Sequence, residues 1–243
     1  MAETIIGRNA VLEALKGNRE IEKITLAKGA EGSVKQIAAK ARDKHIPIYY
    51  SDKARMDKAA SGGVHQGVIA VVSDYKYCTV DDILARAAQR GEDPFIIILD
   101  GLEDPHNLGA IMRTAECAGV HGIVIPKRRS VSVTETVAKT SAGAVEYMLC
   151  AKVTNIANEI EKLKEKGVWI GACDMGSDLY YRQDLKGPIA IVIGAEGAGI
   201  SRLVKEKCDF VVSIPMKGNI TSLNASNAAS ILMYEVVRQR MDI

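Results

Sequence analysis

The sequence predicts an α/β protein with two domains, of which the larger is built on a parallel β-sheet. From residue 95 onward, short and almost wholly apolar segments alternate with helical ones, which is typical of a parallel sheet covered by helices on both faces. Before residue 75, strand and helix patterns alternate over a shorter stretch and predict a smaller α/β domain. With 243 residues, the chain is long enough for each domain to bury its own core.

Hydrophobic periodicity predicts the elements of the first domain, residues 1–74. Amphipathic spacing indicates helices over 6–15, 33–44 and 52–60, and apolar runs indicate strands over 23–27, 46–50 and 67–72. Residues 75–94 begin with a polar segment, continue with helical spacing over 80–89 and end with the helix breakers Gly91 and Pro94. We therefore predict a linker at 75–94 and a second domain at 95–243.

Six strands are predicted in the second domain, over 95–99, 122–125, 147–153, 168–172, 189–193 and 210–214. One helix is expected to begin near Ile200. The clearest helix closes the chain, because apolar residues recur at i, i+3 and i+4 between Ala225 and Val237, and Asn224 is a natural cap for its first turn.

Two of these strands run into loops of glycine and small polar residues. The strand that ends at Ile193 opens into Gly194-Ala195-Glu196-Gly197-Ala198-Gly199, and the strand that ends at Ile214 is followed by Met216 and by Ser222-Leu223-Asn224. Such loops at the carboxyl edge of a parallel sheet predict a pocket for a polar small molecule. The glycines do not fit G-x-G-x-x-G, and no G-K-[ST] follows, so the pattern disfavours a dinucleotide or ATP phosphate loop.

Composition narrows the class of protein further. The five cysteines are odd in number, scattered and never in C-x-x-C, and the four histidines have no ligand-like spacing, so neither disulfides nor a metal are expected. The amino terminus lacks the pattern of a signal peptide, and no apolar run approaches the roughly 18 residues of a membrane span. We expect a cytoplasmic protein that does not bind membranes.

Three separated blocks, in order, resemble the motifs of the SpoU (TrmH-like) branch of the SPOUT RNA methyltransferases. They are Leu99-Asp100-Gly101 through Asn107-Leu108-Gly109 and Arg113-Thr114-Ala115-Glu116, the Gly194–Gly199 loop, and Ile214-Pro215-Met216 with Ser222-Leu223-Asn224. The layout is most similar to the RlmB-like group, which methylates a guanosine ribose in large-subunit rRNA. The resemblance implies a trefoil knot in the second domain, a ribosomal-protein-like first domain, a homodimer and the cofactor S-adenosylmethionine.

The first block supplies two expected catalytic residues, Asn107 and Arg113. By its position alone, Asn107 is also a candidate helix cap, and Arg113 could form a surface pair with Glu116. The resemblance instead implies that Asn107 is functional and that Arg113 is the essential arginine. Because a guanidinium is hard to deprotonate, we expect Arg113 to stabilise charge on the ribose 2′-oxygen and to hold a phosphate, which could accept the proton.

The second and third blocks are implied to hold the cofactor. Glu196, Ser222 and Asn224 are also expected to reach the reacting centre, although an acidic residue near a helix N-terminus and capping residues are the plain structural alternatives. The full set of expected cofactor residues is Ala172, Cys173, Gly194, Ala195, Glu196, Gly197, Ile214, Met216, Ser222, Leu223 and Asn224.

RNA contacts are expected from both domains. Residues 1–74 carry twelve Lys and Arg against nine Asp and Glu, whereas the whole chain has a net charge of only +2. The basic run Lys127-Arg128-Arg129 follows a predicted strand and could meet phosphates, or could simply be a solvated surface. The segments around Arg8, and around His65 and Gln66, resemble the RNA-binding domain of the family's ribosomal members.

These observations predict an enzyme that transfers a methyl group from S-adenosylmethionine to a ribose 2′-oxygen, in a guanosine of 23S rRNA. A tRNA ribose methyltransferase remains open, although the separate first domain argues against it. A non-catalytic RNA-binding or ribosome-assembly factor with the same fold also remains open, and the joint presence of Asn107, Arg113, Glu196, Ser222 and Asn224 speaks against it.

Overall fold

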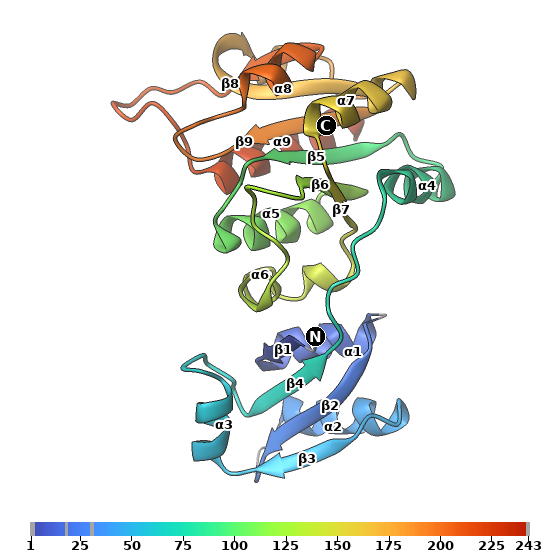
Figure 1. The fold of residues 1–243 in the computed structure, drawn as a ribbon, viewed down its shortest axis with the longest axis vertical. Coiled ribbons are helices and arrows are strands. Elements are labelled where there is room, and N and C mark those ends of the chain that lie inside the picture. Colours follow the sequence, from blue (N-terminus) through green and yellow to red (C-terminus); the bar gives the residue numbers. More distant parts are fainter. Residues whose placement is uncertain (1–2, 18, 30–31, 242–243) are drawn as a thin grey trace. The chain divides into compact units, whose positions relative to one another are not determined.

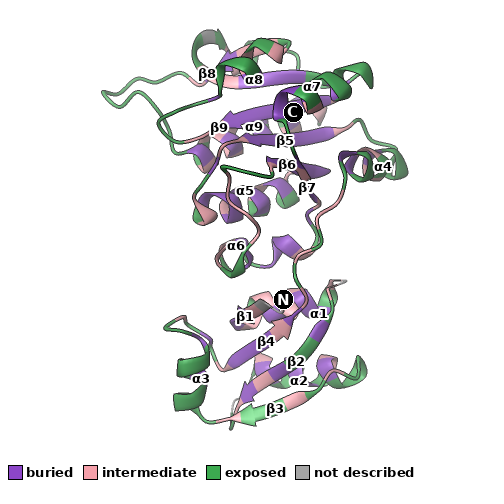
Figure 2. Ribbon diagram, in the orientation of Figure 1, coloured by how far each residue is buried: buried purple, intermediate pink, exposed green. Residues whose placement is uncertain are grey.

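A computed structural model describes residues 3–17, 19–29 and 32–241. It divides the chain into two compact units (Figure 1). The first unit contains Met1–Lys76 and Val133–Tyr147, and the second contains Tyr77–Ser132 and Met148–Ile243. Each unit has its own sheet and its own buried residues, which Figure 2 shows along the central strands.

The first unit is built on a four-stranded mixed sheet with the order β1-β4-β2-β3. Its strands are β1 (Glu3–Ile6), β2 (Ile21–Ala27), β3 (Ile48–Ser51) and β4 (Val68–Val72). Strand β4 is antiparallel to both β1 and β2, whereas β3 is parallel to β2. The helices are α1 (Arg8–Lys16), α2 (Ser33–Asp43), α3 (Lys53–Ala59), α6 (Glu135–Thr140) and the 3-10 turn η1 (Ala144–Glu146).

The second unit is built on a six-stranded sheet with the order β10-β8-β9-β5-β6-β7, in which all neighbouring strands are parallel. Its strands are β5 (Phe95–Asp100), β6 (Gly122–Pro126), β7 (Cys150–Val153), β8 (Trp169–Leu179), β9 (Ile189–Gly194) and β10 (Phe210–Ser213). Strands β5 and β9 lie at the centre and are buried up to their last residue. This burial on both faces explains their nearly unbroken apolar sequences.

The described helices of the second unit are α4 (Val80–Arg90), α5 (Pro105–Cys117), α7 (Ile156–Glu165), α8 (Arg202–Lys207), α9 (Ala225–Arg240) and the 3-10 turn η2 (Tyr180–Arg182). Helices α4, α7 and α8 share one hydrophobic cluster with the strands. Helices α5 and α9 pack against each other, and α9 also packs against β9. The parallel α/β sheet expected from the sequence is therefore present, whereas the trefoil knot stays a prediction.

The segment 75–94, expected to be a linker, belongs largely to the second unit. Helix α4 begins with a capping box in which the side chains of Thr79 and Asp82 bond to each other's backbone N–H. Its Val80 and Ile83 are part of the second unit's core. Ile83 lies so close to Gly122 that a Cβ there would be 2.5 Å away.

Residues 133–147 were expected in the second domain, but they pack with the first unit. The buried side chains of Arg19 and Glu146 form an ion pair at 3.4 Å. The Tyr147 hydroxyl donates to the Glu13 carboxylate at 2.7 Å. Strand β7 accordingly starts at Cys150, later than the predicted residue 147.

Candidate active site

The loop after β9 is closed by its own backbone. Ala195 and Gly199 exchange two hydrogen bonds, of 3.1 and 2.9 Å, and Gly197 and Gly199 have positive φ angles of 79° and 66°. Gly194 cannot carry a side chain, because a Cβ would lie 2.2 Å from the Gly199 carbonyl carbon. The glycines thus fold residues 194–199 into a tight loop at the carboxyl end of the central strand.

A cavity of about 530 Å³ lies beside this loop. All predicted cofactor residues except Ala172 line it, together with neighbours such as Asp174, Met175, Ile193, Thr221 and Ala228. Ala172 is instead fully buried in the core cluster of β8. The cavity volume is that of a small-molecule site, and its lining combines apolar side chains with a few polar groups.

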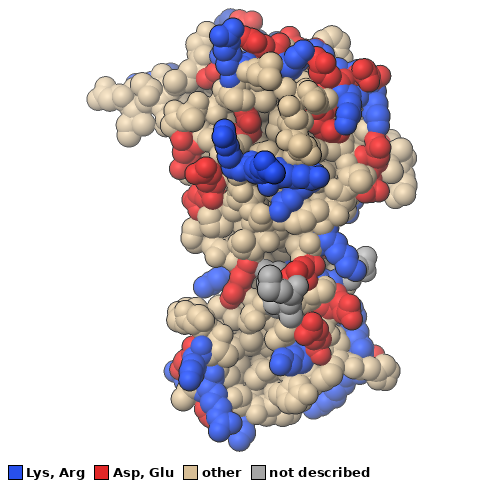
Figure 3. Space-filling view, viewed as in Figure 1, with Lys and Arg blue, Asp and Glu red and all other residues tan. Residues whose placement is uncertain are grey.

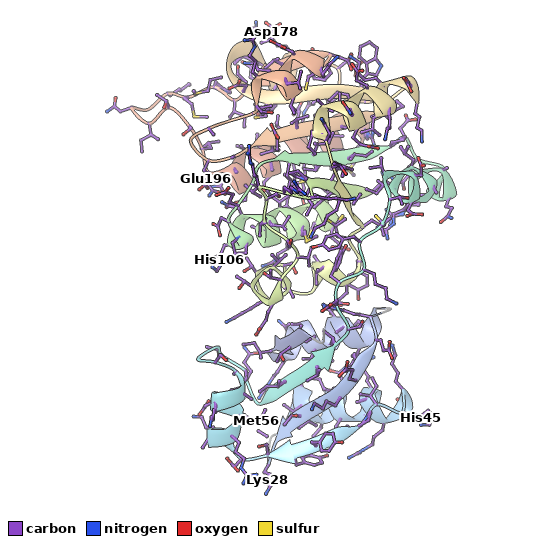
Figure 4. The ribbon with its side chains drawn as sticks, viewed as in Figure 1. Lys28, His45, Met56, His106, Asp178 and Glu196 are labelled. Carbon is purple, nitrogen blue, oxygen red and sulfur yellow. The ribbon has the colours of Figure 1, made fainter. Side chains whose placement is uncertain are left out.

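Three polar side chains from separate parts of the sequence meet at one edge of this cavity. Asn107 Nδ2 donates to Glu196 Oε1 at 2.8 Å, and Asn224 Nδ2 donates to the same oxygen at 2.6 Å. Asn224 Nδ2 also donates to Asn107 Oδ1 at 2.9 Å. Figure 4 marks Glu196 on the same side of the second unit as His106, the neighbour of Asn107. Two amide donors therefore fix the Glu196 carboxylate.

Asn107 does not cap helix α5, so that interpretation is wrong. The cap is Asp104, whose side chain accepts from the His106 N–H at 2.8 Å, and Pro105 occupies the first turn. Asn107 is the third residue of the helix and is only 5% exposed, and its side chain bonds to Glu196 and Asn224 instead of capping the helix. Asn224 combines both roles, because its Oδ1 caps α9 through the Ser226 N–H at 2.9 Å.

Arg113 is not part of this group. It lies six residues after Asn107 on α5, which places it about 120° around the helix and about 9 Å further along it. Its side chain is exposed and has no hydrogen bond or ion pair with any described residue, so the surface pair with Glu116 is not formed. Arg113 lines neither this cavity nor the one next to it.

A second cavity of about 510 Å³ shares Ala195, Glu196 and Gly199 with the first. Its other walls come from Asn107, from residues 100–104 and from Arg129. Asp100 fixes this wall, since its carboxylate accepts from the Ser201 N–H at 2.7 Å. The sequence reasoning missed Asp100 as a site residue, although its position at the end of a buried strand was a usable signal.

Two titratable groups that line the first cavity have shifted pKa values. Burial, reinforced by Asp174, raises the pKa of the Cys173 thiol to about 11, so this thiol stays protonated and unreactive at neutral pH. Burial also raises the pKa of Asp174, but bonds from Lys205 and the Met175 N–H outweigh it, and the net pKa is lowered. Cys173 is therefore a wall of the cavity and not a nucleophile.

The residues predicted to contact RNA lie in different environments. His65 is buried, with Nδ1 accepting from the Gly67 N–H and Nε2 bonded to Asp57, each at 2.9 Å. This position does not fit a direct RNA contact. Arg8 Nε donates to the Gln66 carbonyl at 2.9 Å, and the Arg8 N–H donates to Gln66 Oε1 at 3.0 Å. His65, Arg8 and Gln66 thus hold the 63–67 turn against α1.

Lys127, Arg128 and Arg129 are all exposed. Figure 3 shows Lys and Arg side chains gathered on one face of the second unit. The described residues contain no group of three or more His, Cys, Asp or Glu side chains placed to hold a metal ion. Within the described part of the chain, no helix combines the length and the apolar character of a membrane span.

Comparison with known proteins assigns the family. The SpoU rRNA Methylase family model matches residues 94–234, and a model for RNA 2′-O ribose methyltransferase substrate binding matches residues 4–78. A putative TrmH family tRNA/rRNA methyltransferase of Bacillus subtilis, YacO, is 49% identical over 97% of this chain and 95% of its own.

Two solved structures show how far the fold extends. The AdoMet-bound rRNA methyltransferase of Sinorhizobium meliloti has a TM-score of 0.80 and 22% identity, covering 98% of this chain and 87% of its own. The TrmH/SpoU tRNA modifying enzyme of A. aeolicus has a TM-score of 0.57 and 28% identity, covering 62% and 77%. The chain belongs to the SpoU family and is an S-adenosylmethionine-dependent RNA methyltransferase.

Proposed function

We propose that the protein methylates a ribose 2′-oxygen, in a guanosine of large-subunit rRNA. The observation that supports this most is the pair of cavities that meet at Glu196. One has the size and lining of a cofactor site, and the other, with Arg129 in its wall, can accept a nucleotide with its phosphate. A methyl transfer needs this arrangement, because donor and acceptor must meet in line at one point.

The first cavity fits S-adenosylmethionine. The Gly194–Gly199 backbone leaves a cradle that a Cβ at Gly194 would destroy. Met216 and Leu223 offer apolar surface, and the Glu196 carboxylate lies at the edge where the positive charge of a sulfonium would be stabilised. When bound, S-adenosylmethionine supplies the electrophilic methyl group.

The chain's own residues orient the acceptor and manage its charge. Asn107 and Asn224 hold Glu196 in one orientation at the boundary of the two cavities, so its position needs no reorganisation during the reaction. For the ribose 2′-oxygen to accept a methyl group, its hydroxyl proton must leave. Arg113, which we propose below is supplied by a second copy of the chain, stabilises the developing oxyanion, and a substrate phosphate accepts the proton.

Two features support rRNA over tRNA as the substrate. The S. meliloti rRNA methyltransferase matches both units of this chain, whereas the A. aeolicus tRNA enzyme covers only 62% of it. The additional first unit is matched by a substrate-binding family model. Mapping 2′-O-methyl sites in rRNA and tRNA from cells with and without the gene tests this choice. A site lost from 23S rRNA is expected, and a site lost only from tRNA would contradict it.

We further propose a homodimer, supported by the position of Arg113. Since Arg113 is exposed and lines neither cavity of its own chain, a second copy is the simplest way to bring it to the reacting oxygen. Inactive Arg113→Ala and Gly194→Ala variants should then partly restore methyl transfer when they are mixed, because one site of each mixed dimer is intact. If the mixed variants exchange subunits but transfer no more methyl groups than either variant alone, the proposal that two chains share one active site is contradicted.

A further inference from the structure

The second unit has a third cavity that the proposed reaction does not use. It has a volume of about 420 Å³ and lies beside the ends of β6 and β7, the start of α4 and one side of α7. Unlike the other two cavities, it contains no residue of the 194–199 loop. All its lining residues belong to the second unit.

Lysines dominate this cavity. Four of them line it, against two carboxylates, Asp81 and Glu159. Each carboxylate is already paired, since Lys162 contacts Glu159 at 3.2 Å and Lys166 contacts Asp81. The remaining lysines, Lys127 and Lys152, have no acidic partner among the residues that the structure describes. The cavity therefore carries two uncompensated positive charges.

Lys152 is held in place although it is not neutralised. Its Nζ donates to Ser132 Oγ at 2.8 Å and lies 4.1 Å from the centre of the Tyr77 ring. A neutral hydroxyl and an aromatic face orient an ammonium group without cancelling its charge. A concave surface with fixed, unpaired cations focuses the electrostatic field and attracts an anion.

The backbone connects this cavity with the one beside Glu196. Lys127 continues the hydrogen bonding of β6 with β7, because its N–H donates to the Val153 carbonyl at 2.8 Å. Lys127 also lines the third cavity, which we call the lysine cavity. Two residues later, Arg129 lines the cavity beside Glu196. Arg129 has a φ of 54°, which is uncommon for a residue with a side chain and turns the backbone sharply here.

The exposed cations Lys127, Arg128 and Arg129 are consecutive, with the first lining one cavity and the third lining the other. Such a run fits a polyanion better than a single phosphate. We propose that the lysine cavity binds the RNA backbone next to the nucleotide that occupies the active site. This inference rests on the proposed function, which makes RNA the ligand of the neighbouring cavity. Lysine contacts to phosphate carry no sequence information, so the contribution is to affinity and register and not to the choice of base.

The test uses the full-length protein and an unmodified in vitro transcript of large-subunit rRNA. Lys127→Ala and the double change Lys127→Ala with Lys152→Ala are compared with Arg90→Ala, which removes an exposed charge from the last turn of α4. Each lost phosphate contact should reduce the slope of log affinity against log salt by about 0.7 to 0.9. The double variant should bind about tenfold more weakly or worse, whereas turnover at saturating RNA and affinity for S-adenosylhomocysteine stay within about twofold.

The outcomes separate this inference from the proposed function. An unchanged slope for both lysine variants, or an equal change for Arg90→Ala, would overturn the inference. So would a Lys127-dependent affinity for inorganic phosphate alone, with RNA binding unaffected. If the wild-type protein binds the transcript but methylates no RNA, the proposed function fails. The salt slopes of the lysine variants then still show whether the lysine cavity binds RNA. If it does not bind RNA at all, both fail. Among the described residues, the Lys127 side chain has no hydrogen-bond or ion-pair partner to lose, so Lys127→Ala should fold as the wild type does.

Discussion

At the scale of single residues, the site depends on one carboxylate held by two amides. Glu196 accepts hydrogen bonds from Asn107 and Asn224, which lie 117 positions apart in the chain. Hydrogen bonds to a charged group contribute more than neutral ones, about 1.5 to 3 kcal/mol each. The network thus joins α5, the 194–199 loop and α9 at the point where the two cavities meet.

Replacing Asn224 by Asp tests this network without removing the helix cap. An Asp oxygen still caps α9, but the second oxygen replaces an amide donor 2.6 Å from Glu196 Oε1. The two like charges should lower affinity for S-adenosylhomocysteine more than about tenfold at pH 7.5. Calorimetry at pH 5.5 should show partial recovery, since a close carboxylate pair takes up a proton more readily. Asn224→Ser is the control that keeps a cap without the charge, and equal losses in both variants at both pH values would refute the account.

Arg113→Ala is expected to lower single-turnover methyl transfer by about 10² to 10³-fold, as for other groups that stabilise charge in the transition state. Arg113→Lys should restore little, because a point charge does not replace the planar guanidinium. Folding should be unaffected, since Arg113 is exposed and unpaired among the described residues. Glu116→Ala is the matched control on the same helix. Near wild-type transfer by Arg113→Ala would exclude the proposed role.

At this scale, the motifs predicted which residues lie together better than local rules did. The residues expected to bind the cofactor, from 194 to 224, line one cavity, because strand ends of a parallel sheet converge. Their role in binding stays a prediction. Asn107 was open to interpretation as a cap because capping rules see only a few residues, and Glu196 is 89 positions away. His65 was expected to contact RNA because its segment resembles an RNA-binding domain, and its buried hydrogen bonds to Asp57 and to the Gly67 N–H become visible only in the fold.

At the scale of elements, the 194–199 loop is specified by backbone geometry. Gly194→Ala would place a methyl group 2.4 Å from the Gly199 carbonyl oxygen and force the Ala195–Gly199 bridge open. We expect a loss of about 1 to 3 kcal/mol in the free energy of unfolding, as for overpacked sites. Binding of S-adenosylhomocysteine should become undetectable by calorimetry.

Gly187→Ala is the control for this change. Gly187 precedes the same strand, has open space for a Cβ and does not have a positive φ. Its replacement should change the free energy of unfolding by less than about 0.5 kcal/mol and leave cofactor binding intact. If Gly194→Ala bound the cofactor as well as Gly187→Ala does, the cradle would not be the cofactor site.

Most elements could be predicted because their hydrophobic periods are unambiguous. All six predicted strands of the second unit exist, and α9 begins at the expected cap. Strand β1 was missed, and the predicted helix began at its last residue, because its four residues gain their place by pairing with the distant β4. Strand β8 extends to Leu179, beyond the predicted residue 172, because β10 pairs with Asp178 and Leu179 after an irregularity. Such pairing is not encoded locally.

At the scale of the whole molecule, one segment from the second half of the chain belongs to the first unit. Residues 133–147 leave the second unit between β6 and β7 and bury Ala144 and Val145 in the first. No local pattern marks this segment, since its partners Glu13 and Arg19 lie more than a hundred positions earlier. The chain therefore passes between the units three times.

This connection changes how the role of the first unit can be tested. Deleting residues 1–76 alone should expose the apolar side chains of 133–147 and destabilise the product. Deleting them and also replacing 133–147 by a short Gly-Ser linker should leave affinity for S-adenosylhomocysteine within about threefold, because the cofactor cavity lies wholly in the second unit. The kcat/KM for methyl transfer to RNA should fall at least about tenfold as phosphate contacts are lost. Full kcat/KM in the truncated protein would show that the first unit does not bind the substrate.

The central claim is that this molecule places a ribose 2′-oxygen, and not a base, against the methyl donor. The most direct measurement incubates the purified protein with S-adenosylmethionine and unmodified large-subunit rRNA, digests the RNA to nucleosides and identifies the methylated product by mass spectrometry. We expect a single product, 2′-O-methylguanosine, that is absent with Arg113→Ala. A base-methylated nucleoside, or an RNA that acquires no methyl group although the protein binds both cofactor and transcript, would contradict the account.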